Sequence, residues 1–143
     1  MAERPVATVR PVEESEASGR VARVFDDIKA TKGIDYVPRF WRVLATDPDH
    51  LESAWARLKA TMHPEASGRA GKLDPLTREI IALAVSATNG CPYCVQSHTA
   101  AARKLGLSVE ALGEVMAVVG LFNSTNAIAH GYQIEPDVFP PQD

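Results

Sequence analysis

The sequence predicts a single all-α domain, and three observations carry that prediction. Apolar residues recur at the three- and four-residue spacing of a helix through most of the 143-residue chain. The pairs Asp47-Pro48 and Asp74-Pro75 are typical helix starts, because Asp caps free amides and proline suits the first helical turn. No segment has a convincing strand pattern, and we find no sequence repeat or domain linker.

The first half of the chain is expected to hold an extended arm and three helices. The arm contains two prolines and several charges without a helical period. The helices follow from apolar spacing between capping residues and the stop signal Gly33. In order, we expect an arm over 1–14, a helix over about 16–31 capped by Ser15 or Ser18, a short apolar helix around 40–44, and a helix from Asp47-Pro48 to His63-Pro64.

The second half is expected to hold three more helices, with a non-helical tail after them. The helix after Asp74-Pro75 is apolar on almost every side, which predicts burial all round, in a core or in an oligomer interface. The polar patch Asn123–Asn126 interrupts the last helix without ending it. In order, we expect a loop over 64–73, helices from Pro75 to about Thr88, from Cys91 to about Leu105, and from Ser108 to about Tyr132, and a C-terminal tail over 134–143.

Composition narrows the class of protein. The chain is 45% hydrophobic and 23% charged, which is ordinary for a soluble protein. A net charge of −3 and a pI of about 5.8 argue against a nucleic-acid binder. No uninterrupted apolar run reaches the roughly 20 residues of a membrane span, and the N-terminus lacks the apolar core of a secretory signal. We therefore expect a cytoplasmic protein without a membrane or nucleic-acid partner.

The segment Cys91-Pro92-Tyr93-Cys94 carries the clearest chemical signal. Its two cysteines are the only ones in the chain, and their spacing allows a disulfide that stores two electrons. Proline after Cys91 indicates a helix N-terminus, where the helix dipole stabilises a thiolate. His98 follows Cys94 by four residues and lies on the same helix face, where an imidazole can take the thiol proton. The segment indicates a redox or nucleophilic thiol site in a reducing compartment.

Glu79 is the second informative residue. Its neighbours at helical spacing are apolar, and it is the one acidic residue between Pro75 and Glu110. A carboxylate on an apolar face needs a partner or shares a proton, which suits a general base or a proton relay. The alternative is a structural Glu79 that complements the helix dipole or pairs with an arginine.

The two cysteines have other interpretations. They could be two small core residues, or they could bind zinc together with His98 and either Glu79 or His130. Haem attachment would need a histidine directly after Cys94, where Val95 stands. Glutaredoxin shares the Cys-Pro-Tyr-Cys sequence, but a helix cap and a long helical pattern precede the motif here, where that fold needs a strand.

Glu79 followed by Cys91-x-x-Cys94-x-x-x-His98 resembles the alkylhydroperoxidase D family of the carboxymuconolactone decarboxylase superfamily, and its peroxidase-related branch in particular. The resemblance is specific over residues 76–122. It implies an all-helical fold, assembly as a trimer or hexamer, and reduction of peroxides by the cysteine pair without a cofactor. A thiol or dithiol reductant, either a protein or a small molecule, then reduces the disulfide.

The resemblance also implies roles for the four residues. Cys94 corresponds to the thiol that attacks peroxide and Cys91 to the resolving thiol, while Glu79 and His98 form the proton relay. The helix-cap argument alone favours Cys91 as the reactive thiol, so the order remains open at this point. Some members have a histidine where this chain has Tyr93. Two other functions stay open: a carboxymuconolactone decarboxylase-like lyase, and a non-enzymatic oligomer that senses redox state or binds thiols.

Overall fold

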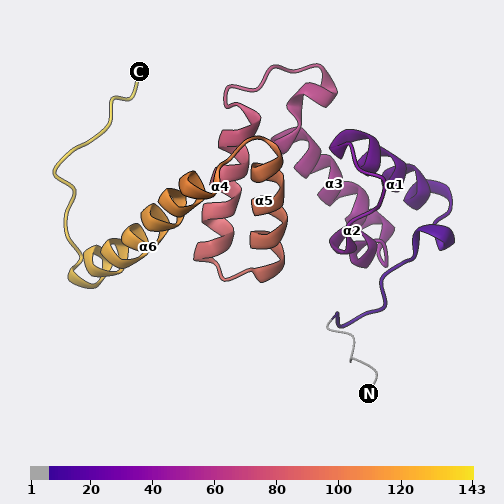
Figure 1. Ribbon diagram of the computed structural model, residues 1–143, viewed down its shortest axis with the longest axis horizontal. Coiled ribbons are helices and arrows are strands. Elements are labelled where there is room, and N and C mark those ends of the chain that lie inside the picture. Colours follow the sequence, from indigo (N-terminus) through magenta and orange to yellow (C-terminus); the bar gives the residue numbers. More distant parts are fainter. Residues whose placement is uncertain (1–6) are drawn as a thin grey trace. The chain divides into compact units, whose positions relative to one another are not determined.

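The protein is all-helical. The computed structural model describes residues 7–143, and within them every regular element is a helix and none is a strand (Figure 1). The all-α prediction is therefore confirmed. The chain divides into two compact units, residues 1–72 and 73–143. The elements are η1 (Glu14–Glu16), α1 (Gly19–Lys32), α2 (Arg39–Leu44), α3 (Pro48–Met62) and η2 (Pro64–Ser67) in the first unit, and α4 (Pro75–Thr88), α5 (Pro92–Lys104) and α6 (Val109–Tyr132) in the second.

The first unit is built around an aromatic core. Helices α1 and α2 both pack against α3. The indole rings of Trp41 on α2 and Trp55 on α3 meet edge to face, with centroids 5.2 Å apart, an arrangement that favours aromatic pairs. Seven buried residues form the core: Phe25, Ile28, Val37, Trp41, Ala45, Leu51 and Trp55.

A charged cluster closes one edge of this core. The Trp55 indole N–H donates to Asp27 Oδ2 at 2.7 Å, and Lys59 Nζ lies 2.9 Å from both carboxylate oxygens. The hydrogen bond from Trp55 and the contact with Lys59 hold the pKa of Asp27 below its ordinary value of 3.8. The ionised carboxylate thus fixes α1 against α3.

The N-terminal arm is only partly described. Residues 1–6 lie outside the described residues, and residues 7–13 form no helix. The arm is held by two backbone contacts: Val12 N–H donates to the Arg42 carbonyl at 2.9 Å, and Val37 N–H donates to Glu14 Oε1 at 2.8 Å. The single-domain organisation expected for 1–143, with an arm and a tail, stays a prediction.

The predicted helix starts are correct. Asp47 accepts from Asp49 N–H and His50 N–H at the start of α3, and Asp74 accepts from Thr77 N–H at the start of α4. In each case proline follows the capping residue directly.

The stretch 64–73, expected to be a loop throughout, contains the short 3₁₀ helix η2, because Pro64 fixes the φ angle of its first residue.

Helix α4 is only partly buried within the single chain, so its expected burial all round, in a core or in an oligomer interface, stays a prediction. It packs against α5 on one face and against α6 on another (Figure 1). Leu83 is fully buried, whereas Ile81 and Val85 are 48% and 53% exposed. Burial in the core of a single chain therefore accounts for only one side of its apolar surface.

Helix α6 exposes most of its apolar residues. It packs against α4, and every residue from Gly120 onward is exposed. By length and composition alone it could cross a membrane, because an 18-residue window has a mean hydropathy of 1.2. The sequence contains no unbroken apolar run of that length, since Asn123–Asn126 interrupt it. An exposed apolar surface of this kind is also typical of a protein–protein interface.

The Asp27 cluster predicts how stability depends on pH. Because the folded pKa is depressed, the ionised carboxylate contributes stability above pH 3.8, and this contribution falls as the pH drops through the folded pKa. Replacing Asp27 with Asn should therefore lower the free energy of unfolding at neutral pH. The difference from the wild type should shrink in acid, as measured by urea unfolding at a series of pH values. Asp26→Asn, at the exposed neighbouring position, is the control. A difference independent of pH would contradict the prediction.

Candidate functional site

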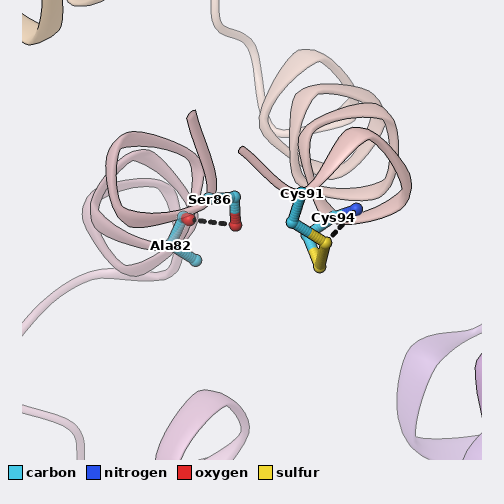
Figure 2. Close-up of a disulfide and its surroundings, with 4 residues drawn as sticks. All are labelled: Ala82, Ser86, Cys91 and Cys94. Carbon is cyan, nitrogen blue, oxygen red and sulfur yellow. Dashed lines mark hydrogen bonds between the residues drawn. A yellow bond between two sulfur atoms is a disulfide. The ribbon is translucent and has the colours of Figure 1, made fainter. Parts of the chain in front are cut away.

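The two cysteines form a disulfide at the start of α5. Cys91 and Cys94 are bonded through sulfur, with Cα atoms 5.3 Å apart (Figure 2). Cys91 is the N-cap residue, and its Sγ accepts a hydrogen bond from the Cys94 N–H at 3.3 Å. Pro92 occupies the first turn, as the sequence predicts. The redox pair therefore sits where the helix presents its unpaired amides and positive dipole end.

A glycine turn brings the motif back toward α4. Helix α4 ends at Thr88, and Gly90 adopts a left-handed φ of 67°, which favours glycine. The chain then reverses, and Cys91 N–H donates to the carbonyl of Ser86 at 3.0 Å. This hydrogen bond anchors the capping cysteine to the preceding helix.

The second pair of site residues meets farther along the same two helices. Glu79 Oε2 lies 2.7 Å from His98 Nδ1. The Glu79 and His98 side chains are only 12% and 26% exposed, so the contact is largely shielded from water. The partner of the Glu79 carboxylate is thus a histidine on the next helix.

Antiparallel register explains why the pairs line up. Glu79 precedes Ser86 by seven residues, and His98 follows Cys91 by seven residues. Seven residues are close to two helical turns, so Glu79 and Ser86 share one face of α4, and Cys91 and His98 share one face of α5. Cys94 lies one turn before His98 on that face.

The arrangement can move electrons and protons together. The cysteine pair cycles between a dithiol and a disulfide, a two-electron change. The Glu79 carboxylate orients His98 through Nδ1, which leaves Nε2 as the ring nitrogen that can exchange a proton elsewhere. Carboxylate–imidazole pairs of this kind serve as general bases for a nucleophile.

Two other residues named from the sequence are exposed. His130 lies in the exposed last turn of α6, and the Tyr93 side chain is 45% exposed. Among the described residues 7–143, no three His, Cys, Asp or Glu side chains gather as a metal site. The ligand set that the zinc interpretation requires is therefore not assembled in this disulfide form.

One residue at the site, Ser86, is not among those that the sequence predicts. Ser86 is 8% exposed and contacts Cys91 through its backbone. The signal that could have found it is its spacing of seven residues from Glu79, on the same helix face.

The fold and the site together define an all-α dithiol protein with a carboxylate–histidine pair. The model of the carboxymuconolactone decarboxylase family matches residues 51–134, and the chain belongs to this family. Within it the chain is an AhpD-like member, as the resemblance predicted. The core of the alkylhydroperoxidase AhpD from Rhodospirillum rubrum is a similar solved structure, 46% identical, covering 93% of this chain and 96% of that chain with a TM-score of 0.85.

Curated relatives are similar over shorter parts. The alkyl hydroperoxide reductase AhpD of Gluconacetobacter diazotrophicus is 35% identical over 57% of this chain and 44% of its own length. The (R)-2-haloacid dehalogenase of Pseudomonas putida is 30% identical over 82% of this chain and 38% of its own length. The chain thus spans less than half the length of these two relatives.

The Glu79–His98 contact predicts a cost in stability when it is broken. Glu79→Ala leaves His98 without its partner in a shielded position, and should lower the free energy of unfolding by about 1–3 kcal/mol. Glu79→Gln keeps an acceptor and should cost less. Denaturant unfolding at one protein concentration measures both variants. Glu135→Ala, in the exposed tail, is the control, and an Ala variant as stable as the wild type would contradict the contact.

Proposed function

We propose that this protein is a thiol-dependent peroxide reductase. The observation that carries the proposal is the Glu79–His98 contact beside the Cys91–Cys94 disulfide, on two helices in one register. A bare cysteine pair stores electrons, whereas a pair with a shielded proton relay can also activate a thiol for attack. The names of the AhpD relatives, which are alkyl hydroperoxide reductases, support the same class of substrate.

The catalytic cycle begins at Cys94, which lies one turn from His98. With Glu79 orienting the imidazole, His98 takes the thiol proton, and the thiolate attacks the terminal oxygen of a hydroperoxide. The O–O bond breaks, Cys94 becomes a sulfenic acid, and the alkoxide leaves as an alcohol with the proton from His98. The helix-cap argument for Cys91 applies equally to the resolving role, since that thiol also reacts as a thiolate.

Resolution and reduction complete the cycle. Cys91 attacks the sulfenic sulfur of Cys94, the disulfide forms, and the sulfenic hydroxyl leaves as water before further oxidation. A dithiol reductant, protein or small molecule, then reopens the bridge by exchange and leaves with its own disulfide. A cytoplasmic location, where thiol reductants are kept reduced, fits this step and forms part of the proposal.

We propose that the protein works as a homo-oligomer, a trimer or a hexamer. Supporting this, α4 and α6 border an open groove of about 410 Å³ with a mainly apolar lining, and α6 carries no buried residue. A second copy of the chain, itself rich in exposed apolar residues, is the occupant we propose. The groove is lined by Ala84, Val85, Thr88, Asn89, Val118, Val119, Phe122, Asn123 and Asn126.

Two alternative functions give different results in one simple measurement. The reduced protein is exposed to a stoichiometric amount of peroxide and its mass is determined without reductant. If the protein runs a thiol cycle, the two cysteines lose two hydrogens as the disulfide forms, and a dithiol restores the original mass. A decarboxylase-like lyase leaves the thiols unchanged. A redox-sensing oligomer forms the disulfide but changes its assembly, and does not turn over peroxide when the dithiol is in excess.

Cysteine variants separate the two thiol roles. Cys94→Ser should abolish dithiol-dependent peroxide turnover and consume no peroxide. Cys91→Ser should consume one equivalent and stop at a sulfenic acid on Cys94, which a diketone probe traps for mass spectrometry. His98→Gln should slow turnover by about 100- to 10,000-fold through loss of the base. Ser97→Ala, at an exposed position of α5, is the control. Full activity of Cys94→Ser would rule out the assigned nucleophile.

Charge placed in the groove should separate the copies. Val118→Asp and Phe122→Asp, at positions 55% and 53% exposed in one chain, would bury a carboxylate in the proposed interface. Light scattering should give three or six times 15.4 kDa for the wild type and 15.4 kDa for the variants. Val138→Asp, in the exposed tail, should leave the assembly intact. A wild type that is a monomer at micromolar concentration would overturn the oligomer.

A further inference from the structure

Ser86 is a nearly buried hydroxyl that the proposed cycle does not use. It lies on the face of α4 that meets α5, and only 8% of the residue is exposed. In the antiparallel register its counterpart on α5 is Cys91, just as the counterpart of Glu79 is His98. The hydrogen bond from Cys91 N–H to the Ser86 carbonyl fixes this pairing at 3.0 Å.

The hydroxyl group of Ser86 can donate its hydrogen bond to a different acceptor by rotating. In the disulfide form Oγ donates to the Ala82 carbonyl at 2.6 Å (Figure 2). Figure 2 shows Oγ on the side of α4 that faces the cysteine pair. A hydroxyl hydrogen rotates about the C–O bond to suit its acceptors, and a carbonyl of the same helix is a neutral acceptor. A nearby thiolate would be a stronger one, because hydrogen bonds to charged groups are about twice as strong.

We propose that the Ser86 hydroxyl turns from Ala82 to the sulfur of Cys91 when the disulfide opens, and stabilises the Cys91 thiolate. The Cys94 N–H already donates to this sulfur in the oxidised form. Two donors, one from the backbone of α5 and one from the side chain of α4, then serve the resolving thiol. Cys94 has no such partner across the helices, since its counterpart in the register is the fully buried Leu83.

The role of Ser86 in the cycle rests on the proposed function. The serine donates a hydrogen bond and transfers no proton in the reduction and resolving steps. When a reductant thiolate attacks Cys94, the S–S bond breaks and its electron pair goes to Cys91, whose thiolate accepts the hydrogen bond from Ser86. The second thiol of the reductant then releases Cys94 and closes the reductant disulfide. In the resolving step, the Cys91 thiolate attacks the sulfenic sulfur, the S–O bond breaks, and the hydroxide leaves as water with a proton that the reductant thiols released. Ser86 donates a hydrogen bond in both steps and is unchanged at the end.

The test measures the thiol itself and needs no peroxidase activity. In a Cys94→Ala background Cys91 is the single thiol, and its alkylation by iodoacetamide is followed from pH 5 to pH 10. Adding Ser86→Ala should lower the alkylation rate at neutral pH about tenfold and shift the midpoint of the pH profile upward, because a charged acceptor loses one hydrogen bond. Ser86→Thr keeps the hydroxyl and should restore the rate and the midpoint. Ser97→Ala should change neither.

Each outcome decides between a thiolate donor and a structural serine. A Ser86→Ala profile that matches that of its parent overturns the proposal. Equal shifts in the Ala and Thr variants, or shifts that follow a drop in melting temperature, overturn it as well, because the hydroxyl would then not be the cause. If the profile shifts as expected but the wild type reduces no peroxide, the hydrogen bond stands and the proposed function fails.

Discussion

The antiparallel contact between α4 and α5 is the constraint on which the site depends. Gly90 allows the reversal between the helices, and the Cys91 N–H bond to Ser86 sets the register. With that register, Glu79 meets His98 two turns away. A slip of one residue would turn each side chain by about 100° around its helix axis and separate both pairs. A single packing contact thus positions the cysteine pair and the Glu79–His98 pair on the same two helices.

The two faces of α4 have different surroundings. One face carries the polar residues of the site and the fully buried Leu83, and packs against α5. The other is apolar, borders α6 and stays open in one chain. Under the proposed assembly, the helix that holds Glu79 would also line the interface between copies. The stiffness of an α-helix would then link the geometry of the site to the state of the oligomer.

Local signals in the sequence predicted most of the fold. Both Asp-Pro starts, the glycine after α1 and the start of α5 at Cys91 lie where expected, because capping depends on residues within one turn. The Glu79–His98 pair could be suspected from the family resemblance, but its contact depends on how two helices pack. Ser86 shares one face of α4 with Glu79, but this spacing alone does not single out a serine in an apolar helix, because its neighbour Cys91 lies beyond the end of that helix. The single chain buries one side of α4, and its apolar composition alone does not say which partner covers the other side.

The residues of the site lie within one helical hairpin, from Glu79 to His98. Closing a connection of three residues between two helices costs little chain entropy, so these contacts can form early in folding and without the first unit. A site formed by neighbouring segments can also occur as a unit in different proteins, because one short piece of chain contains all of its residues. This compactness offers a physical reason why a relative more than twice as long as this chain, the (R)-2-haloacid dehalogenase of Pseudomonas putida, is similar to it across this region.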